Sequence, residues 1–422
     1  LGLIVIDEEQ ESAYKQEATP RYQARSLAER LALEHDALVL LGSATPSVET
    51  YWRSEQDEIE RVELTERVGP ARSGGDRAAL ALPEVEIIDL RRELHRGNAT
   101  LLSDPLHDLL HDTLRRGEQA MLLLNRRGMA TIVICSSCGT TVQCPHCDIP
   151  LVYHQDRRIL LCHRCNYRTR PEQHCGVCGG LLDYFGAGTQ RVESEVKRAF
   201  PEARVLRWDR DSVSRQGGHA RMLKAVEAGD VDIVVGTQMI AKGFDLPMVT
   251  AVGVIHADAL LHLPDFRSAE RTFQLVTQVA GRAGRRTSGG RVIVQSYSPR
   301  HYAITAAARH DFRGFYEAEI AFRRRHRYPP FTRLARYTVR HKDEETCREQ
   351  CEEMALRLAR HLDNLGVDGD LLGPAPAFTS KIRGEHQWQI VLRAKSDDFD
   401  CLLDGLPTHP AWTVDVDPQS ML

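Results

Sequence analysis

The sequence has no run that approaches the roughly 18 apolar residues of a membrane helix, so we expect no membrane span. It also lacks an excess of positive charge, because 55 Lys and Arg stand against 59 Asp and Glu for a net charge of −4. A histone-like polycation is therefore excluded, and any nucleic-acid binding must depend on local basic surface. The opening LGLIVID lacks the basic residues and small-residue cleavage site of a signal peptide, which favours the reducing cytoplasm.

Length and composition exclude a single small module. The chain has 422 residues, of which 42% are hydrophobic and 27% charged, and these values predict a globular protein of two or three domains. An apolar strand at Leu3 to Ile6 runs directly into carboxylates. We therefore expect the chain to begin partway through a domain.

Alternating strand-like and helix-like segments predict two parallel α/β units followed by a smaller α+β unit. The Gly- and Pro-rich segment Gly69 to Pro83 is the predicted linker between the first two units. The composition shifts again at Phe322 to Arg340, where seven arginines and no acidic residue occur. The expected elements are strands at 3–6, 37–41, 85–90, 120–124, 231–235, 250–255, 290–296, 378–382 and 387–392, and helices at 22–33, 190–200, 269–280 and 344–362.

Eight of the eleven cysteines form four C-x-x-C pairs, a pattern that indicates metal rather than disulfides. Apolar runs at 149–153 and 159–161 predict a β-hairpin that brings the second and third pairs together. This gives two nested sites of four thiolates: Cys135, Cys138, Cys175 and Cys178 for the first zinc, and Cys144, Cys147, Cys162 and Cys165 for the second.

Zinc is the expected ion at both sites, with an iron–sulfur cluster as the alternative. A catalytic zinc is disfavoured because no open ligand position is implied. Two sites of four thiolates each remain net negative with Zn²⁺ bound and need N–H groups and cations nearby. The residues placed to supply positive charge, or alternatively to face solvent or DNA, are Arg157, Arg158, Arg164, Arg168 and Arg170.

Two strand ends in the first unit carry motifs suited to nucleotide chemistry. The strand ending at Ile6 leads into Asp7-Glu8-Glu9-Gln10, where one carboxylate can hold Mg²⁺ through water and its neighbour can orient an attacking water. An ordinary solvated acidic cluster is the alternative for this motif taken alone. The next strand leads into Gly42-Ser43-Ala44-Thr45, a small-residue loop that can approach a phosphate site.

The second unit carries a matching set of motifs. Its strand at 231–235 leads into GTQ and AKGFD, and its helix at 269–280 ends in QVAGRAGR. Arg282 and Arg285, three residues apart between glycines, can place guanidinium groups against a γ-phosphate in a cleft between two α/β lobes. A solvated basic helix end is the alternative.

These motifs together resemble the PriA family, the primosomal replication-restart DNA helicases of superfamily 2 in bacteria. The resemblance covers essentially the whole chain. It rests on the eight-cysteine spacing and on DEEQ at 7–10, YKQE at 14–17, PRYQAR at 20–25, GSATPSVET at 42–50, LLNRRG at 123–128, GTQRVE at 188–193, DRDS at 209–212, GTQMIAKGFD at 236–245, DFRSAERTFQLVTQVAGRAGR at 265–285 and YPPF at 328–331.

The resemblance implies an α/β fold with two RecA-like helicase lobes, the first incomplete, an inserted binuclear zinc module and a small α+β C-terminal domain. The implied parts are lobe one at 1–92, lobe two at 93–134 and 180–318, the zinc-binding insertion at 135–179 and a DNA-binding C-terminal domain at 319–422. The arginines of 322–340 fit contacts to DNA phosphates. The alternative for that segment is a solvated domain junction.

The resemblance also implies an ATP-dependent 3′–5′ helicase with Mg²⁺ and ATP as its substrate complex. Asp7 and Glu8 are then the Mg²⁺ and water-activating pair, and Arg282 and Arg285 act as catalytic arginines. The positions that bind ATP or couple its state to DNA are Gln10, Gly42, Ser43, Ala44, Thr45, Gly243, Asp245 and Gln278.

The implied partners are single-stranded and forked DNA, single-strand-binding protein, and the primosome proteins PriB, DnaT, DnaB and DnaC. The implied location is the cytoplasm, in association with the nucleoid. No membrane partner is expected.

Three departures from the family pattern matter. None of the seven lysines follows a glycine, so the family's P-loop is missing and we expect this chain alone to be inactive as an ATPase. The family's N-terminal DNA-binding domain is also missing. Most members read DEEH where this chain has Gln10, a residue that can still form hydrogen bonds but cannot titrate.

Two other functions remain open from the sequence. An ATPase-dead scaffold could bind forks and partners through its zinc and C-terminal domains. A generic zinc-ribbon nucleic-acid module would need none of the strand-end motifs. In either case Cys347, Cys351 and Cys401 are expected to stay free, with Cys347 and Cys351 packing on one helix face.

Overall fold

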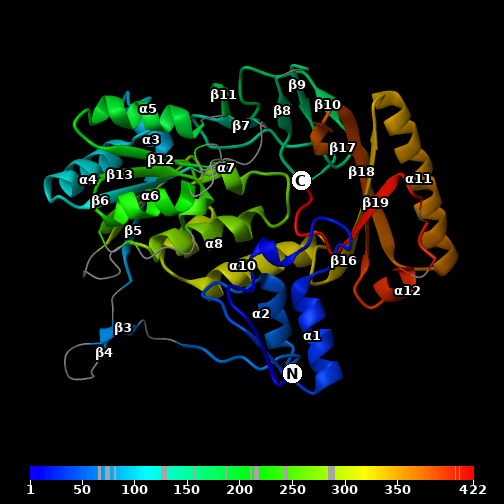
Figure 1. Ribbon diagram of the computed structural model, residues 1–422. Helices are drawn as coiled ribbons and strands as arrows, with labels where there is room; N and C mark the ends of the chain where they lie inside the picture. Colours follow the sequence, from blue (N-terminus) through cyan, green and yellow to red (C-terminus); the bar gives the residue numbers. More distant parts are fainter. Residues whose placement is uncertain are drawn as a thin grey trace.

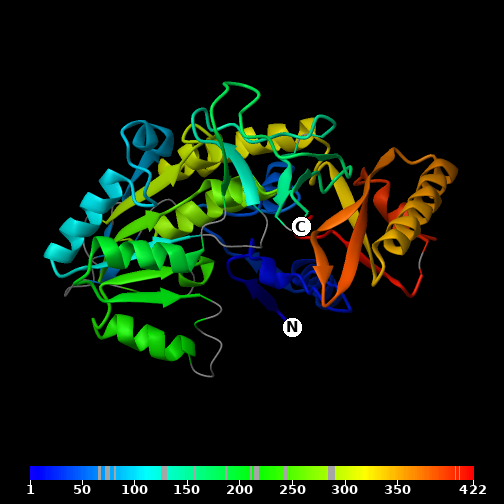
Figure 2. The same ribbon diagram turned by 90° about the horizontal axis from the view of Figure 1, so that it is seen from above.

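A computed structural model of the chain describes residues 1–64, 68–71, 77–79, 82–124, 131–147, 149–155, 157–185, 188–209, 212, 218–241, 246, 248–283, 290–403, 405–407 and 409–422. Figures 1 and 2 show a small N-terminal part, a large α/β part, a cysteine-rich insertion and a C-terminal domain. Among the described helices, none combines the length and the apolar character needed to cross a membrane.

The N-terminal part contains the expected strand–helix–strand unit. Its two strands pair in parallel, with Leu3 opposite Leu38 and Ile6 opposite Leu41. Ser47 caps the following helix, because its side chain accepts a hydrogen bond from the Thr50 amide. The elements are β1 (Leu3–Ile6), the 3-10 helix η1 (Ser12–Tyr14), α1 (Ala24–His35), β2 (Leu38–Leu41) and α2 (Val48–Glu55).

The large part is built on a six-stranded parallel sheet in the order β12-β13-β6-β14-β15-β5. Its strands are β5 (Glu84–Asp89), β6 (Gln119–Leu123), β12 (Val205–Trp208), β13 (Ile233–Gly236), β14 (Val249–Val254) and β15 (Arg291–Ser296). Its helices are α3 (Leu90–His95), α4 (Asp104–Arg115), α5 (Thr189–Ala199), α6 (Gly218–Glu227), η2 (Gln238–Ala241), α7 (Asp258–Leu261), α8 (Ser268–Ala280), α9 (Tyr302–Ala308) and α10 (Phe312–Arg325).

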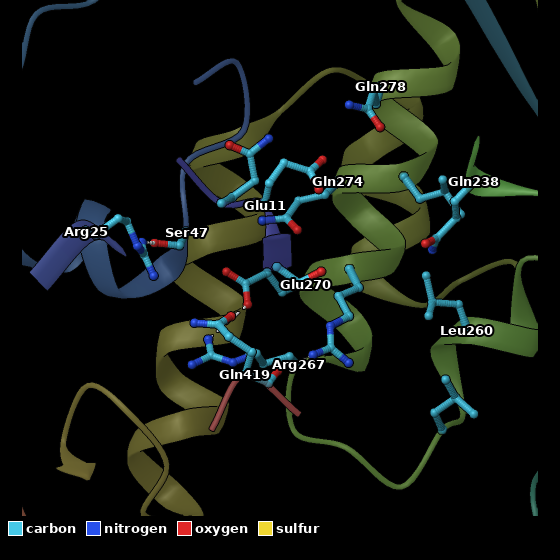
Figure 3. A pocket seen from close by; sticks show the side chains of 15 residues that line it. Glu11, Arg25, Ser47, Gln238, Leu260, Arg267, Glu270, Gln274, Gln278 and Gln419 are labelled. Carbon is cyan, nitrogen blue, oxygen red and sulfur yellow. Dashed lines mark hydrogen bonds and ion pairs between the residues drawn. The ribbon is translucent and has the colours of Figure 1, made fainter. Parts of the chain in front are cut away.

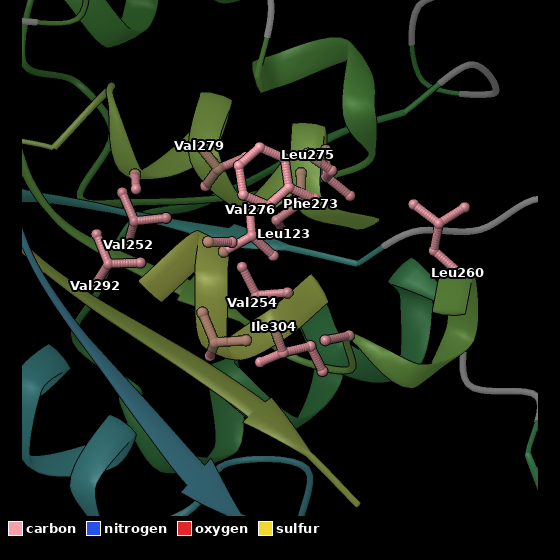
Figure 4. Packing of buried hydrophobic residues seen from close by; sticks show 14 of the residues in the cluster. Leu123, Val252, Val254, Leu260, Phe273, Leu275, Val276, Val279, Val292 and Ile304 are labelled. Carbon is pink, nitrogen blue, oxygen red and sulfur yellow. The ribbon is translucent and has the colours of Figure 1, made fainter. Parts of the chain in front are cut away.

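Alternation along the buried strands divides this core between the two faces of the sheet. On β6, Ala120 and Leu122 pack in one cluster with residues of α4 and α5. Met121 and Leu123 pack in the other cluster with residues of α8, α9 and α10, part of which is drawn in Figure 4. Helices on both faces explain why these strands are continuously apolar rather than alternately polar. The expected parallel α/β architecture is confirmed for this part.

Two elements of the structure cross the predicted domain limits. Strand β5 lies before residue 92 but pairs in parallel with β15, so it belongs to the large sheet rather than to lobe one. The limit at residue 319 falls inside α10, because the arginines at 323–325 form the last turn of this helix. The predicted linker at 69–83 lies partly outside the described residues. Its described part contains β4 (Arg77–Ala79) and nearly all of β3 (Val68–Ala71), which pair antiparallel.

The cysteine-rich insertion is an antiparallel sheet in the order β10-β9-β8-β7-β11. Its first and last strands pair with each other, with Cys135 opposite Leu182, so the insertion leaves and re-enters the large part at one place. The predicted hairpin is confirmed by the pairing of β8 with β9. The strands are β7 (Thr131–Cys135), β8 (Val152–His154), β9 (Ile159–Leu161), β10 (Arg168–Thr169) and β11 (Leu182–Phe185).

The C-terminal domain packs one long helix against an antiparallel sheet in the order β17-β18-β16-β19. As expected, Cys347 and Cys351 lie on the buried face of the helix, with Met354, Leu358 and Leu362. The elements are β16 (Thr332–His341), α11 (Glu344–Leu365), β17 (Gly369–Ile382), β18 (Glu385–Lys395), α12 (Phe399–Leu403) and β19 (Trp412–Val416).

The last residues of the chain lie where the N-terminal, large and C-terminal parts meet (Figure 2). Lys15 of the N-terminal part forms an ion pair with Asp415 at 3.0 Å. The Asp265 carboxylate, ahead of α8, accepts hydrogen bonds from the Ser420 hydroxyl and the Met421 amide. Arg336 of β16 donates to the Leu422 carbonyl at 2.9 Å. This segment therefore fixes the C-terminal domain against the other two parts.

Candidate functional site

The eight clustered cysteines form the two nested sites that the spacing predicts. Cys135, Cys138, Cys175 and Cys178 gather in one group and Cys144, Cys147, Cys162 and Cys165 in the other, each with all its sulfurs within 4.8 Å of one another. Three of the Sγ–Sγ separations are 3.5 Å (Cys135–Cys178), 3.8 Å (Cys138–Cys175) and 3.6 Å (Cys144–Cys165). Tetrahedral zinc with Zn–S bonds of about 2.3 Å places its sulfurs about 3.8 Å apart, so both groups fit structural zinc.

Polar groups around the thiolates support this fit. The amide of Val177 donates to Cys175 Sγ and that of Gly180 to Cys178 Sγ, each at 3.4 Å. Burial tends to raise the pKa of Cys138, but hydrogen bonds from the Thr140 hydroxyl and amide lower it to about 6. Burial raises the pKa of Cys162 to about 12, so its ionisation depends on a bound cation.

The two strand-end motifs of the N-terminal part lie in direct contact. Gln10 donates through Nε2 to Glu8 Oε2 at 2.6 Å, and its Oε1 accepts from the Ser43 hydroxyl at 2.6 Å. The same Ser43 Oγ accepts from the Thr45 amide at 2.9 Å. The parallel pairing of β1 with β2 brings the two strand ends side by side. Gln10 is therefore the link between the acidic motif and the loop Gly42 to Thr45.

Asp7 and Glu8 lie at the exposed end of β1. Gly42 follows the neighbouring strand, and a Cβ on it would come 3.4 Å from Asp7 Oδ1. Glu8 has a φ of 48°, in the left-handed region that non-glycine residues seldom adopt. Such conformations concentrate at functional sites, where surrounding contacts hold them in place.

Glu9, the third residue of the acidic motif, is buried and stabilises the contact between β1, α1 and α2. Its carboxylate accepts from the Ser47 amide at 2.6 Å and from the Thr50 hydroxyl at 3.1 Å, and it pairs with Arg25 of α1. These contacts fix the start of α2 to the end of β1. Arg25 belongs to the PRYQAR motif, whose role the sequence left unassigned.

A pocket lies between the N-terminal part and helix α8 (Figure 3). It is open to solvent and has about 850 Å³ of empty space including its mouth. Gln10 and Ser47 line it from one side, and Glu270, Gln274 and Gln278 of α8 line it from the other. Asp7 and Glu8 are not among the lining residues, so the pocket adjoins the acidic pair rather than containing it.

The predicted residues of the large part are only partly described. Gln278 lies near the end of α8 and lines the pocket. Arg282 follows in the turn that ends this helix, with its amide donating to the Val279 carbonyl at 3.0 Å. Gly243, Asp245 and Arg285 lie outside the described residues.

Sequence reasoning missed a buried ionic cluster beside the pocket. It contains two arginines, Arg323 of α10 and Arg267 at the start of α8. Each of them forms ion pairs with Glu49 of α2 and Glu270 of α8. The available signal was the set of charged residues at 267, 270 and 323, interleaved with apolar positions of two helices. That pattern indicates burial only when the facing helices are known.

The zinc module contacts both of its neighbours. On the large part, Arg91 donates to the Cys138 carbonyl at 3.0 Å, and Gly139 lies so near Tyr297 that a Cβ would be 2.2 Å from its carbonyl oxygen. On the C-terminal domain, Arg157 makes two hydrogen bonds with Glu344 at 2.8 and 2.9 Å. The first zinc site therefore lies against the large part.

The second zinc site lies against the C-terminal domain. His163, between the ligands Cys162 and Cys165, places Nδ1 3.0 Å from the Pro376 carbonyl. Burial lowers the pKa of His163 to about 4, so the ring is neutral at pH 7. Because a carbonyl can only accept, Nδ1 carries the proton and Nε2 accepts from His154 at 2.9 Å.

The arginines around the zinc sites and at 322–340 differ from the expectation. Arg157 bonds to Glu344, and Arg164 lies 5.5 Å from the ring centre of Tyr328, so both contact the C-terminal domain. Arg323 is wholly buried, and Arg333 bonds to Asp417. Within the segment 322–340, ion pairs engage Arg323, Arg327, Arg333 and Arg336, while Arg324, Arg325 and Arg340 are exposed.

Two family models match parts of the chain. The model described as "Primosomal protein N C-terminal domain" matches residues 324–419. The model described as "PriA DNA helicase Cys-rich region (CRR) domain" matches residues 144–170, which include the second zinc site.

Curated relatives match nearly the whole chain. The Replication restart protein PriA of Bacillus subtilis is 44% identical over 97% of this chain and 50% of its own length. The protein of the same name from Synechocystis is 38% identical over 100% of this chain and 51% of its own. The protein of the same name from Treponema pallidum is 39% identical over 94% of this chain and 58% of its own length. The chain thus spans about half the length of these relatives.

Solved helicase structures resemble the chain more distantly. Dbp5 of S. cerevisiae bound to RNA and ADP BeF3 aligns with a TM-score of 0.39 and 13% identity over 77% of this chain and 63% of its own. The DUF1998 helicase MrfA bound to DNA aligns with a TM-score of 0.36 and 13% identity over 74% of this chain and 32% of its own. At these scores the fold rests on the sheet order and helix placement described above.

Proposed function

The chain belongs to the PriA family of replication restart proteins, and from this premise we propose that it acts within an ATP-dependent 3′–5′ DNA helicase. This helicase recognises stalled or branched replication forks and begins the reloading of the replicative helicase. The observation that carries the proposal is the Gln10 side chain, which joins the acidic strand end to the loop after β2. Gln10 and Ser47 line one pocket opposite helix α8.

The roles we assign are those that the resemblance to this family implies. Asp7 holds Mg²⁺ through water, and Glu8 orients the water that attacks the γ-phosphate of ATP. Arg282 and Arg285 offset the charge that develops on the transferred phosphoryl group. Gln10, with Ser43 and Thr45, passes the state of the nucleotide to the DNA-binding surface, and Gln278 completes the site from α8. Gly42, Ala44, Gly243 and Asp245 belong to the same nucleotide-responsive loops.

The two zinc sites are structural in this proposal, because each already has four cysteine ligands. The module they hold contributes to strand separation and to contacts with PriB and DnaT. The C-terminal domain contributes to binding branched DNA. Single-strand-binding protein and the DnaB–DnaC loading system complete the partners, and the protein acts at the nucleoid in the cytoplasm.

Unwinding of forked DNA tests the proposal. The protein encoded by the complete reading frame is mixed with labelled forks that carry a single-stranded arm of either polarity, with ATP or with a non-hydrolysable analogue. We expect ATP-dependent unwinding of forks that are entered 3′ to 5′, at a rate that Arg282→Ala lowers. Unwinding that proceeds only 5′ to 3′, or that needs no ATP, contradicts the proposal.

A second candidate is a fork-binding scaffold without ATPase activity. The observation that favours it is that no lysine of this sequence follows a glycine, so residues 1–422 contain no P-loop. If this candidate is correct, the protein encoded by the complete reading frame binds forks and primosome proteins but neither hydrolyses ATP nor unwinds DNA. The same assay therefore separates the two candidates.

A further inference from the structure

Arg323 carries a charge that the structure buries completely. Its side chain is 0% exposed, and it lies in α10 beside three carboxylates. Nε donates to Glu319 Oε1 at 2.8 Å, Nη2 donates to Glu270 Oε2 at 2.8 Å, and Nη1 lies 3.0 Å from Glu49 Oε1. Burying a guanidinium is costly unless carboxylates and further hydrogen bonds surround it. The position therefore demands an explanation beyond simple packing.

The three carboxylates come from three different elements. Glu49 lies in α2 of the N-terminal part, Glu270 in α8 of the large part, and Glu319 one turn before Arg323 in α10. Burial tends to raise the pKa of Glu49, but Arg267 and Arg323 lower it to about 2. Glu49 is therefore ionised at neutral pH, and its ion pairs join the two parts that border the pocket.

Glu270 continues this link toward the loop after β2. While Oε2 accepts from Arg323, Oε1 accepts from the Val48 amide at 2.9 Å. Val48 follows Ser47, whose amide is held by Glu9 of the acidic motif. Glu270 and Arg267 line the pocket together with Ser47 and Gln278, and Figure 3 shows Gln278 further along α8 from Glu270. Arg323 therefore contacts α2 through Glu49 and α8 through Glu270, and Glu270 in turn accepts from the Val48 amide at the start of α2.

We propose that Arg323 is a positioning residue for ATP hydrolysis, because it holds α8, with Gln278 and Arg282, at a fixed place relative to the loop Gly42 to Thr45. The inference rests on the proposed function. Without the guanidinium, the buried carboxylates of Glu270 and Glu319 and the half-buried carboxylate of Glu49 face one another, and α2 separates from α8. The groups that must meet around the γ-phosphate then come together less often, while each remains chemically intact.

The test uses Arg323→Met, Arg323→Lys and Glu49→Gln in the protein encoded by the complete reading frame. Glu49→Gln keeps a hydrogen-bonding group and removes the charge that pairs α2 with Arg267 and Arg323, so it tests the inference even where Arg323→Met does not fold. The matched control is Arg313→Met, because Arg313 lies on the exposed face of the same helix and pairs with the exposed Glu317.

We expect Arg323→Met to lower the DNA-stimulated kcat for ATP about 10- to 100-fold, as misplaced catalytic groups do, with KM for ATP changed less than about threefold. Arg323→Lys restores part of the rate, Glu49→Gln shows a smaller loss of the same kind, and Arg313→Met shows none. A raised KM with an unchanged kcat overturns the inference, as does a loss of kcat that only follows the unfolded fraction.

A second readout separates this inference from the proposed function. Hydrogen exchange of the Val48 amide reports the contact with Glu270 without any turnover. We expect exchange at Val48 to accelerate in Glu49→Gln and Arg323→Lys and to stay unchanged in Arg313→Met. If the unmodified protein hydrolyses no ATP, the proposed function fails, while unchanged Val48 exchange in both variants overturns the positioning role by itself.

Discussion

At the scale of single residues, Gln10 joins two loops that follow different strands. Its amide group donates to Glu8 and accepts from Ser43, so both functions of the side chain are used. A carboxylate at this position cannot donate, and an alanine can do neither. The hydrogen bonds leave the fold of each strand intact and set only how the loop after β2 follows the acidic motif.

We predict that Gln10→Ala uncouples these loops with little loss of stability. The DNA-stimulated rate of ATP hydrolysis should fall about tenfold, the order expected for a misplaced group, while the melting temperature changes little because Gln10 is only half-buried. Steady-state hydrolysis and thermal unfolding check the two parts. Gln16→Ala, at an exposed position of the same segment, is the control. Equal rates for the two variants would count against coupling through Gln10.

The sequence predicted these residues to different degrees. The closeness of Gln10 and Ser43 could be predicted from the sequence, because the ends of adjacent parallel strands meet at one edge of a sheet. The burial of Arg323 could not be predicted, because it depends on how α10 packs against α2 and α8, which carry Glu49 and Glu270. A run of arginines in the sequence looks the same whether it faces solvent, DNA or a ring of carboxylates.

At the scale of elements, α8 and α10 pack through aromatic rings beneath the pocket. Phe273 of α8 is 1% exposed and stacks on Phe315 of α10, with ring centres 4.3 Å apart. This contact lies in the core cluster that also holds strand β14 (Figure 4). The apolar contact and the Arg323 ion pairs therefore join the same two helices.

We predict that Phe273→Ala lowers the free energy of unfolding of the large part by about 3–5 kcal/mol, because it leaves a cavity among close-packed side chains. Urea unfolding followed by circular dichroism measures this change. Leu356→Ala removes a 60% exposed side chain on α11 and should change stability by less than about 0.5 kcal/mol. Similar losses in both variants would contradict the assigned packing.

The nested zinc sites yield a second prediction at this scale. Replacing Cys147 and Cys162 together by serine should lower the zinc content from two ions per chain to about one, because the other group keeps its four sulfurs. Elemental analysis of purified protein measures the content. Cys347→Ser with Cys351→Ser, two buried cysteines outside both groups, should leave it at two. Loss of both ions from a folded Cys147/Cys162 variant would refute independent sites.

Strand β16 shows why part of the C-terminal domain was missed. It carries Arg333, Arg336 and Arg340 at spacings that hide the alternation of a strand, although Leu334, Ala335 and Tyr337 are buried. Arg333 bonds to Asp417 and Arg336 to the chain's last segment, while Arg340 is exposed and donates to Gln387. The metal sites were predicted completely, since ligand spacing and one hairpin determine which cysteines can meet.

At the scale of the whole molecule, the zinc module connects the large part with the C-terminal domain. One end is held by Arg91 and the tight approach of Gly139 to Tyr297. The other end is held by the pair Arg157–Glu344 and by His163 on the Pro376 carbonyl. Movements of the large part can therefore reach the C-terminal domain through the module as well as through the direct contacts of the last residues.

We predict that Glu344→Gln loosens the second connection without unfolding either domain. The pair is partly exposed, so its loss should speed hydrogen exchange in peptides spanning β8 and β9 only about two- to fivefold. Mass-spectrometric exchange measures this effect. Glu345→Gln, the next residue, removes an exposed pair with Arg348 on the same helix and is the control. Unchanged exchange in Glu344→Gln would show that the module is held by its other contacts, such as those of His163 and Arg164.

The arrangement of the parts was the least accessible from sequence. Strand β5 was predicted as a strand, but its partner β15 begins about 200 residues later, and no local pattern identifies a partner at that distance. Contacts of the zinc module with the C-terminal domain use Arg157 and Glu344, which look like any exposed charges in the sequence.

The most direct test of the central claim is the rate of DNA-stimulated ATP hydrolysis by the protein encoded by the complete reading frame, measured with and without Glu8→Gln. The account predicts that Glu8→Gln lowers this rate by at least about 100-fold, as removal of a water-orienting carboxylate does, while both zinc ions and forked-DNA binding are retained. Glu34→Gln, at an exposed position of α1, should leave the rate unchanged. A Glu8→Gln variant that hydrolyses ATP at nearly the unmodified rate would contradict the account.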